Sequence, residues 1–144
     1  MKPKEFIDQL DDARIVSAIA AAELRTSGEI RVYVSHKKRE DAVAAAQARF
    51  LKLGMVKTRE RNAVLIYFAP LTQQFAIWGD VGVHEKCGQS LWSETAAQMT
   101  PLLKGGQYTE AVIEAVQRVG DALARHFPRS PDDKNELPDH VDRD

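Results

Sequence analysis

The most restrictive feature of this sequence is an uninterrupted apolar run, Ala-Val-Leu-Ile-Tyr-Phe-Ala, from Ala63 to Ala69. The run is far too short to span a bilayer as a helix, but it has the usual length of a β-strand. Because side chains alternate between the two faces of a sheet, a strand that is apolar throughout must be covered on both faces. The sequence therefore predicts an interior strand between two layers of helices.

Two further strands are expected beside this run. Residues 29–35 alternate apolar and polar side chains after a chain reversal at Gly28. Residues 74–79 follow the run after a turn containing Pro70, close enough to pair with it antiparallel as a hairpin. A helix is expected between the first strand and the run, which favours parallel pairing of those two. The predicted sheet is therefore mixed.

Helical spacing of apolar residues marks the remaining stretches before residue 128. A helical segment begins near Pro3, with a possible new start at Asp11–Asp12 and an end near Arg25; others cover residues 41–53, 91–103 and 109–127. After Phe127 the chain becomes rich in proline and acidic residues, with little to bury. We therefore expect one α/β domain over residues 1–127 and a tail over residues 128–144.

Charge and cysteine content limit the partners and the compartment. The chain has 20 Lys and Arg residues against 21 Asp and Glu residues, and this balance does not favour nucleic acid or an anionic membrane as a partner. The N-terminal residues lack the apolar run of a secretory signal, and no later stretch is long and apolar enough for membrane insertion. Cys87 is the single cysteine, which fits a reducing compartment. We expect a cytoplasmic protein.

Three loops are expected to meet at one edge of the predicted sheet. Residues 27–29 open the first strand, residues 59–62 open the second, and residues 79–82 close the third. These loops bring together Glu29, Asn62 and Asp80. Two carboxylates and an amide oxygen are hard donors, which suit Ca²⁺ or Mg²⁺ better than a soft metal. A divalent-cation site is therefore one interpretation of this edge.

A purely structural role is the other interpretation. Asp80 follows a glycine at a strand end, where an aspartate commonly forms a turn or caps a helix, and Glu29 at a strand entrance is commonly solvated. In the cation interpretation, Gly79 and Gly82 would let backbone carbonyls approach as further ligands. Arg61 would neutralise the edge or hold a phosphate group beside the metal. Spacing alone leaves both interpretations open.

Four segments in this order resemble the TPM domain family, which is named after a thylakoid lumen protein, a photosystem II repair protein and a receptor modulator. The segments are Thr26–Val32, Leu53–Met55, Arg61–Tyr67 and Gly79–Val83, and the resemblance continues through His126–Pro128 and Asn135–Asp139. It implies a three-layer α/β/α sandwich with a small mixed sheet of three to four strands and about four to five helices. One departure is Ala63, where many relatives have glycine after the asparagine.

The resemblance also implies a function. It implies a groove that binds Ca²⁺ or Mg²⁺ through Glu29, Asn62 and Asp80, with Gly28, Arg61, Gly79, Val81 and Gly82 as backbone or neighbouring contributors. It implies a soluble interaction module in protein quality control or complex assembly, with a protein partner and an oligomeric state that the sequence leaves unknown. Acid phosphatase activity attributed to a plant member makes a metal-dependent phosphatase the alternative. The sequence offers no convincing set of catalytic acid and base residues near the proposed metal, so its catalytic residues stay unassigned.

Overall fold

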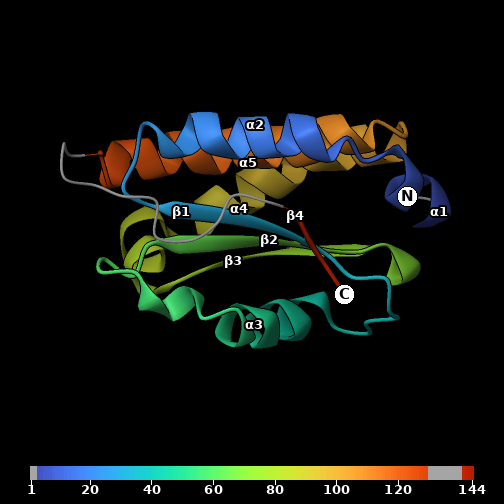
Figure 1. The fold of residues 1–144 in the computed structure, drawn as a ribbon, viewed down its shortest axis with the longest axis horizontal. Helices are drawn as coiled ribbons and strands as arrows, with labels where there is room; N and C mark the ends of the chain where they lie inside the picture. Colours follow the sequence, from blue (N-terminus) through green and yellow to red (C-terminus); the bar gives the residue numbers. More distant parts are fainter. Residues whose placement is uncertain (1–2, 130–140) are drawn as a thin grey trace.

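A four-stranded mixed sheet lies between two layers of helices in the computed structural model, which describes residues 3–129 and 141–144 (Figure 1). The strands are β1 (Glu29–Val34), β2 (Ala63–Ala69), β3 (Gln74–Gly79) and β4 (Val141–Arg143), in the spatial order β3-β2-β1-β4. β1 pairs parallel with β2 and with β4, whereas β3 pairs antiparallel with β2. The expected mixed sheet is thus confirmed.

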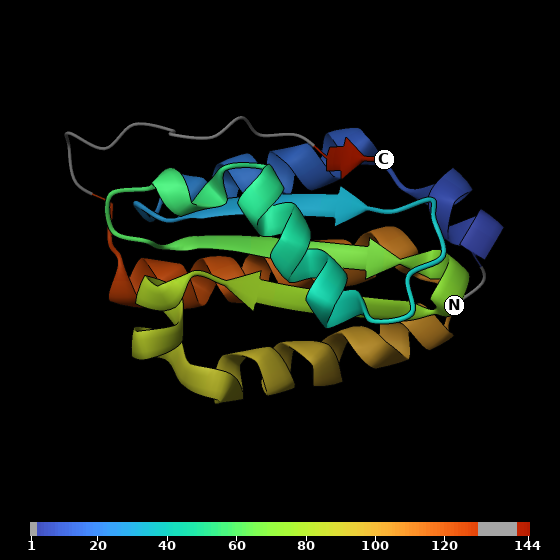
Figure 2. The same ribbon diagram turned by 90° about the horizontal axis from the view of Figure 1, so that it is seen from below.

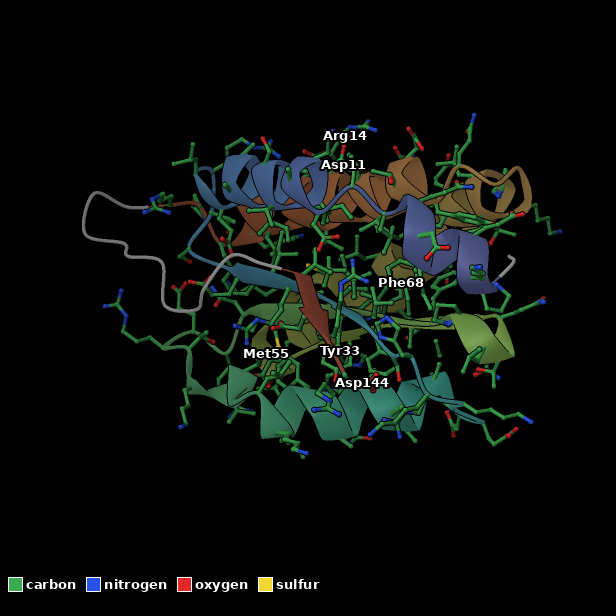
Figure 3. The ribbon with its side chains drawn as sticks, turned by 45° about the vertical axis from the view of Figure 1, so that its right-hand side comes forward. Asp11, Arg14, Tyr33, Met55, Phe68 and Asp144 are labelled. Carbon is green, nitrogen blue, oxygen red and sulfur yellow. The ribbon has the colours of Figure 1, made fainter. Side chains whose placement is uncertain are left out.

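The apolar run of β2 is buried on both faces of the sheet. Val64, Ile66 and Phe68 belong to one hydrophobic cluster, and Leu65 and Tyr67 belong to another on the opposite face. Figure 3 shows Phe68 on the side of α1, and Tyr33 and Met55 on the side of α3. This alternation confirms the sequence argument for an interior strand covered on both faces.

The two helical layers are unequal (Figures 1 and 2). One layer contains α1 (Pro3–Gln9), α2 (Asp12–Glu23), α4 (Val81–Lys104) and α5 (Tyr108–His126), whose buried residues join the larger cluster. The other layer contains α3 (Ala42–Lys52) and the short 3₁₀ helix η1 (Met55–Lys57); a second 3₁₀ helix, η2 (Pro70–Thr72), links β2 to β3. The α/β/α sandwich is confirmed. None of the described helices is long and apolar enough to cross a membrane.

Helix α4 begins ten residues earlier than the sequence pattern indicated. It was expected near Leu91, but it starts at Val81, directly after the capping residue Asp80. Gly88 has φ 70° and ψ −175°, so the helix is interrupted there, which obscures its apolar periodicity. Val81 and Gly82, expected in a loop, therefore lie in the first helical turn.

The C-terminal residues return to the sheet. Val141–Arg143 form β4 within the segment that the sequence pattern assigned to the tail, and Val32 to Val34 of β1 are their partners. Thr26 forms an isolated bridge with Pro128, so the chain is still in contact with the domain just after α5. The rest of the expected tail, including Asn135–Asp139, lies outside the described residues.

Candidate metal centre

Glu29, Asn62 and Asp80 come together at the edge of the sheet where β1 and β2 begin and β3 ends, the end that Figure 2 draws at the left. The backbone N–H of Glu29 donates to the carbonyl of Asn62 (3.4 Å), and the N–H of Asp80 donates to the carbonyl of Ala63 (3.0 Å). All three residues are buried, with exposed fractions of 2%, 1% and 4%. The expectation that Glu29 is solvated was therefore wrong, because the adjoining loops cover the strand entrance.

Asp80 has two structural tasks at this edge. Its carboxylate caps α4 by accepting a hydrogen bond from the N–H of Val81 (2.8 Å). The guanidinium of Arg61 donates to both carboxylate oxygens, from Nε to Oδ2 (2.6 Å) and from Nη2 to Oδ1 (2.8 Å). These hydrogen bonds raise the pKa of Arg61 above its ordinary value. Asp80 is thus both the N-cap of α4 and the ion-pair partner of Arg61.

Arg61 is the solvent-facing partner in this contact. Its side chain is 45% exposed, whereas that of Asp80 is 5% exposed. Its backbone has φ 51°, a left-handed conformation that directs the loop of residues 59–62 across the start of α4. The guanidinium therefore lies between buried carboxylate and water, a position from which it can rotate outward.

Asn62 has an amide of which only one half is hydrogen-bonded. Its Nδ2 donates to Ser27 Oγ (3.1 Å) and to Glu60 Oε2 (3.1 Å), and Ser27 Oγ in turn donates to Glu60 Oε2. The carboxylate of Glu60 accepts only, so it fixes which end of the amide faces it. Asn62 Oδ1 is buried, and no group in residues 3–129 or 141–144 donates a hydrogen bond to it. A buried amide oxygen of this kind has capacity for a further partner.

The glycines at this edge allow close packing of the loops against the helices and strands. A Cβ atom at Gly82 would lie 2.4 Å from the carbonyl oxygen of Glu60 and 2.7 Å from that of Arg61. The N–H of Gly82 donates to the Arg61 carbonyl (2.9 Å), so loop and helix are in direct backbone contact. Gly28 packs in the same way against Leu123, and Gly79 packs against Trp92.

Similarity to known proteins identifies the family of this chain. The model of the TPM domain, which carries the name TPM_phosphatase, matches residues 1–122. The chain belongs to the TPM domain family. The NMR structure of BA42 protein, from the psychrophilic bacterium Bizionia argentinensis, is similar to this chain with 33% sequence identity and a TM-score of 0.87, and the match covers 94% of this chain and 96% of that one. No curated protein matched the chain.

The predicted cation site of this TPM domain has few charged ligands. Glu29 and Asp80 are the two carboxylates of the predicted trio, and no group of three His, Cys, Asp or Glu residues in the described parts of the chain could hold a metal ion by itself. A cation here would depend on the Asn62 amide and on backbone or water oxygens as well. Oxygen donors of this kind are those that hard cations such as Ca²⁺ and Mg²⁺ take as ligands.

Two residues of this TPM domain site were missed by the sequence argument. Ser27 and Glu60 hold the amide of Asn62, although both belong to loops that had been predicted to converge. A carboxylate two residues before Asn62 was a usable signal, since the expected edge already contained polar residues from both loops. Only the tertiary structure shows that Glu60 turns toward Asn62.

Proposed function

We propose that this TPM domain is a divalent-cation-binding interaction module, in which Ca²⁺ or Mg²⁺ orders the loops around Glu29, Asn62 and Asp80. The observation that supports the proposal most is Asn62 Oδ1, a buried acceptor without a hydrogen-bond donor among the described residues. A hard cation would satisfy that oxygen, and the two carboxylates would supply the negative charge. Its role in quality control or complex assembly, and a cytoplasmic location suggested by the single Cys87, are parts of the same proposal.

Binding of a cation would require Arg61 to give up Asp80. Arg61 is the positive partner of that carboxylate in the present conformation, at 2.6 and 2.8 Å. Only the arginine of this pair is half exposed, so water would solvate the guanidinium when it is released, and the incoming cation would take its place beside the buried Asp80 carboxylate. The exchange of Arg61 for a cation is therefore an accessible step, and it would be accompanied by movement of the loop of residues 59–62.

The test is a calorimetric titration of the full chain with Ca²⁺ and Mg²⁺, together with amide NMR spectra. We expect saturable binding and shifts at Gly28, Glu29, Asn62 and Asp80, with binding lost in Asp80→Ala. Asp121→Asn is a matched control, since Asp121 is an exposed carboxylate on α5 that forms an ion pair with Arg25. Amide signals at the sheet edge that stay unmoved at millimolar cation would contradict the proposal.

A metal-dependent phosphatase is the second candidate, favoured by the name of the family model that matches residues 1–122. In that candidate the cation would polarise a phosphoryl oxygen, and a bound water or Asp80 would attack phosphorus. His84 lies one turn along α4 from Asp80, and its backbone N–H donates to the Asp80 carbonyl (3.0 Å). Among the described residues, the hydrogen bonds of the Asp80 carboxylate come from Arg61 and Val81 and not from the His84 imidazole, so we rank binding above catalysis. Hydrolysis of a phosphomonoester that survives both Asp80→Asn and EDTA would exclude this mechanism.

A further inference from the structure

A groove of about 670 Å³ runs along β3 on the side away from β2. Five consecutive residues of β3, Phe75 to Gly79, line it, together with Val43 of α3 and residues of α4 between Val81 and Ala96. Residues from both faces of β3 take part, so the groove follows the edge of the strand and not one face of the sheet. Figure 2 shows β3 as the outer strand, with α4 lying beyond it and α3 crossing the sheet.

The backbone groups that face this groove follow from the pairing of β2. The Ala63 carbonyl accepts from Asp80, so Ala63 faces β3, whereas the Phe68 carbonyl accepts from Ser35 and so faces β1. Phe68 is opposite Phe75, and Ile66 is opposite Ile77. Because orientations alternate along a strand, the N–H and C=O groups of Phe75, Ile77 and Gly79 point away from β2.

These outward groups have a regular spacing that matches an extended backbone. No hydrogen bond within residues 3–129 and 141–144 engages the N–H groups of Phe75, Ile77 or Gly79 on that side. Such an edge is the complement of one more strand, which it would bind by main-chain hydrogen bonds. Aromatic side chains stand on both sides of it, Trp78 toward the α3 layer and Trp92 from α4.

The charge of the groove selects among occupants. Asp80 and Glu85 are among the lining residues, and the described residues that line the groove include no lysine or arginine. Arg61 neutralises Asp80, so Glu85 determines the sign of the charge at the end near Gly79. An occupant with a basic side chain at that end is therefore favoured over an acidic one.

A second copy of the chain is a poorer fit than a separate segment. The edge of β3 forms the floor of a groove with walls from α3 and α4. In a symmetric pair both edges would be recessed, so the helices of the two copies would meet before the strands could pair. A single extended segment has no such walls.

We propose that the free edge of β3 binds an extended segment of a partner protein as an added strand, with apolar side chains against Trp78 and Trp92 and a lysine or arginine near Glu85. This surface would be the place at which the interaction module proposed above contacts its partner. It does not depend on the cation, so the experiment is done without divalent ions, and failure of the groove and failure of the cation site are separate results.

The experiment uses the full ¹⁵N-labelled chain and the probe peptide acetyl-Lys-Val-Leu-Val-Leu-Val-amide, which has apolar side chains on both faces of the strand, with a second peptide that has lysine at the other end. One of the two should bind, with shifts and slower hydrogen exchange at the amides of Phe75, Ile77 and Gly79. The amides of Ala76 and Trp78, which face β2, should keep their exchange rates. Glu85→Gln should weaken the binding of whichever peptide binds by about two- to fivefold, the range for an exposed ion pair.

Backbone methylation of the peptide distinguishes strand addition from loose apolar contact. N-methyl groups on one alternate set of peptide amides should weaken binding by about tenfold or more, and the same groups on the other set by much less, because only one set faces β3. Equal effects of the two sets would overturn the proposal. Absence of binding by both peptides at millimolar concentration, or peptide-independent dimerisation through β3, would also overturn it.

Discussion

Asn62 is a buried side chain that is oriented by hydrogen bonds at one end of its amide and has no donor among the described residues at the other end. Its Nδ2 is fixed by Ser27 and Glu60, which leaves Oδ1 buried and in a defined direction. Burial of an amide oxygen without a donor costs about 1 to 3 kcal/mol, so the fold retains it against a penalty. A ligand that satisfies Oδ1 would remove that penalty, which is the residue-scale basis of the cation proposal.

Arg61→Asn should raise the affinity for Ca²⁺. Loss of the guanidinium removes the positive charge that competes for Asp80, and asparagine tolerates the left-handed backbone at this position. We expect a gain of about two- to fivefold, the range for a half-exposed ion pair. Calorimetry measures it, and Arg61→Lys, which retains the charge, should stay near the wild-type affinity. A lower affinity in Arg61→Asn would show that the arginine supports the site rather than competes for it.

Gly82→Ala should destabilise the domain. The added Cβ would lie 2.4 Å from the Glu60 carbonyl and 2.7 Å from that of Arg61, and both are backbone atoms that cannot move aside cheaply. We expect the free energy of unfolding in urea to fall by about 2 kcal/mol, as for an overpacked site. Gly105→Ala is the matched control, because its nearest neighbour would be 3.4 Å away; equal losses in the two variants would reject this explanation.

At the scale of elements, Asp80 connects β3 to α4. Asp80→Ala removes both the helix cap and the contact with Arg61, whereas Asp80→Asn keeps an oxygen that can accept from Val81. We expect Asp80→Ala to lower the free energy of unfolding by about 1 to 2 kcal/mol and Asp80→Asn by less, while both lose Ca²⁺ binding. Urea unfolding and calorimetry separate the two roles. Asp80→Asn with wild-type cation affinity would leave only the structural role.

Strand β4 is held on the sheet by side-chain contacts of Asp142 and Asp144 as well as by backbone pairing with β1. The carboxylate of Asp144 accepts from Ser35 Oγ (2.7 Å), from the N–H of His36 (2.7 Å) and from Arg39 Nη2 (3.1 Å). Arg31 of β1 forms an ion pair with Asp142 of β4, with 2.9 Å between Nε and Oδ2. A strand this short needs such contacts, because its few ladder hydrogen bonds barely offset the ordering of the chain end.

Attachment of β4 should therefore depend on pH. Desolvation raises the pKa of Asp144, but the hydrogen bonds from Ser35, His36 and Arg39 outweigh it, so the pKa lies below its ordinary value. A lowered folded pKa means that the contribution is complete above the unfolded pKa of about 4, and is lost as pH falls through the folded value. Amide exchange of Val141 to Arg143 should accelerate accordingly, after correction for the intrinsic rate.

Asp144→Asn tests this attachment directly. At pH 7 it should reduce the opening free energy of β4 by about 1 kcal/mol, and the difference from wild type should disappear at the acid end. Asp121→Asn, on the exposed side of α5, should change nothing in β4. A difference between Asp144→Asn and wild type that is the same at all pH values would exclude the carboxylate as its cause.

At the scale of the whole molecule, the proposed cation site joins segments from three parts of the chain. Cation binding should therefore stabilise the global fold and not only one loop. At about 100 times the dissociation constant, a ligand adds about 2.7 kcal/mol, which corresponds to a rise in Tm of about 5 to 10 °C for a domain of this size. Thermal unfolding should show this rise with Ca²⁺ or Mg²⁺ and its reversal by EDTA. The same rise in Asp80→Asn would place the cation elsewhere.

The sequence by itself was sufficient for strands β1, β2 and β3 and for the two covering layers. The run of Ala63 to Ala69 has no polar face, so burial on both sides was unavoidable, and the intervening helix favoured parallel pairing with β1. From that pairing it followed that Glu29, Asn62 and Asp80 would lie at one edge. Hydrophobic burial and chain connectivity are properties of the sequence pattern, and they determine topology.

Only the tertiary structure decided how the polar groups at that edge are used. Arg61 takes both oxygens of Asp80, Glu60 turns to Asn62, and the end of the chain returns as β4 beside β1. Each outcome depends on directional contacts between residues far apart in sequence, whose energies differ by only a kcal/mol or two from those of competing arrangements. Such small differences leave no periodicity to be recognised, which is why the sequence indicated where the site would be but not what occupies each oxygen.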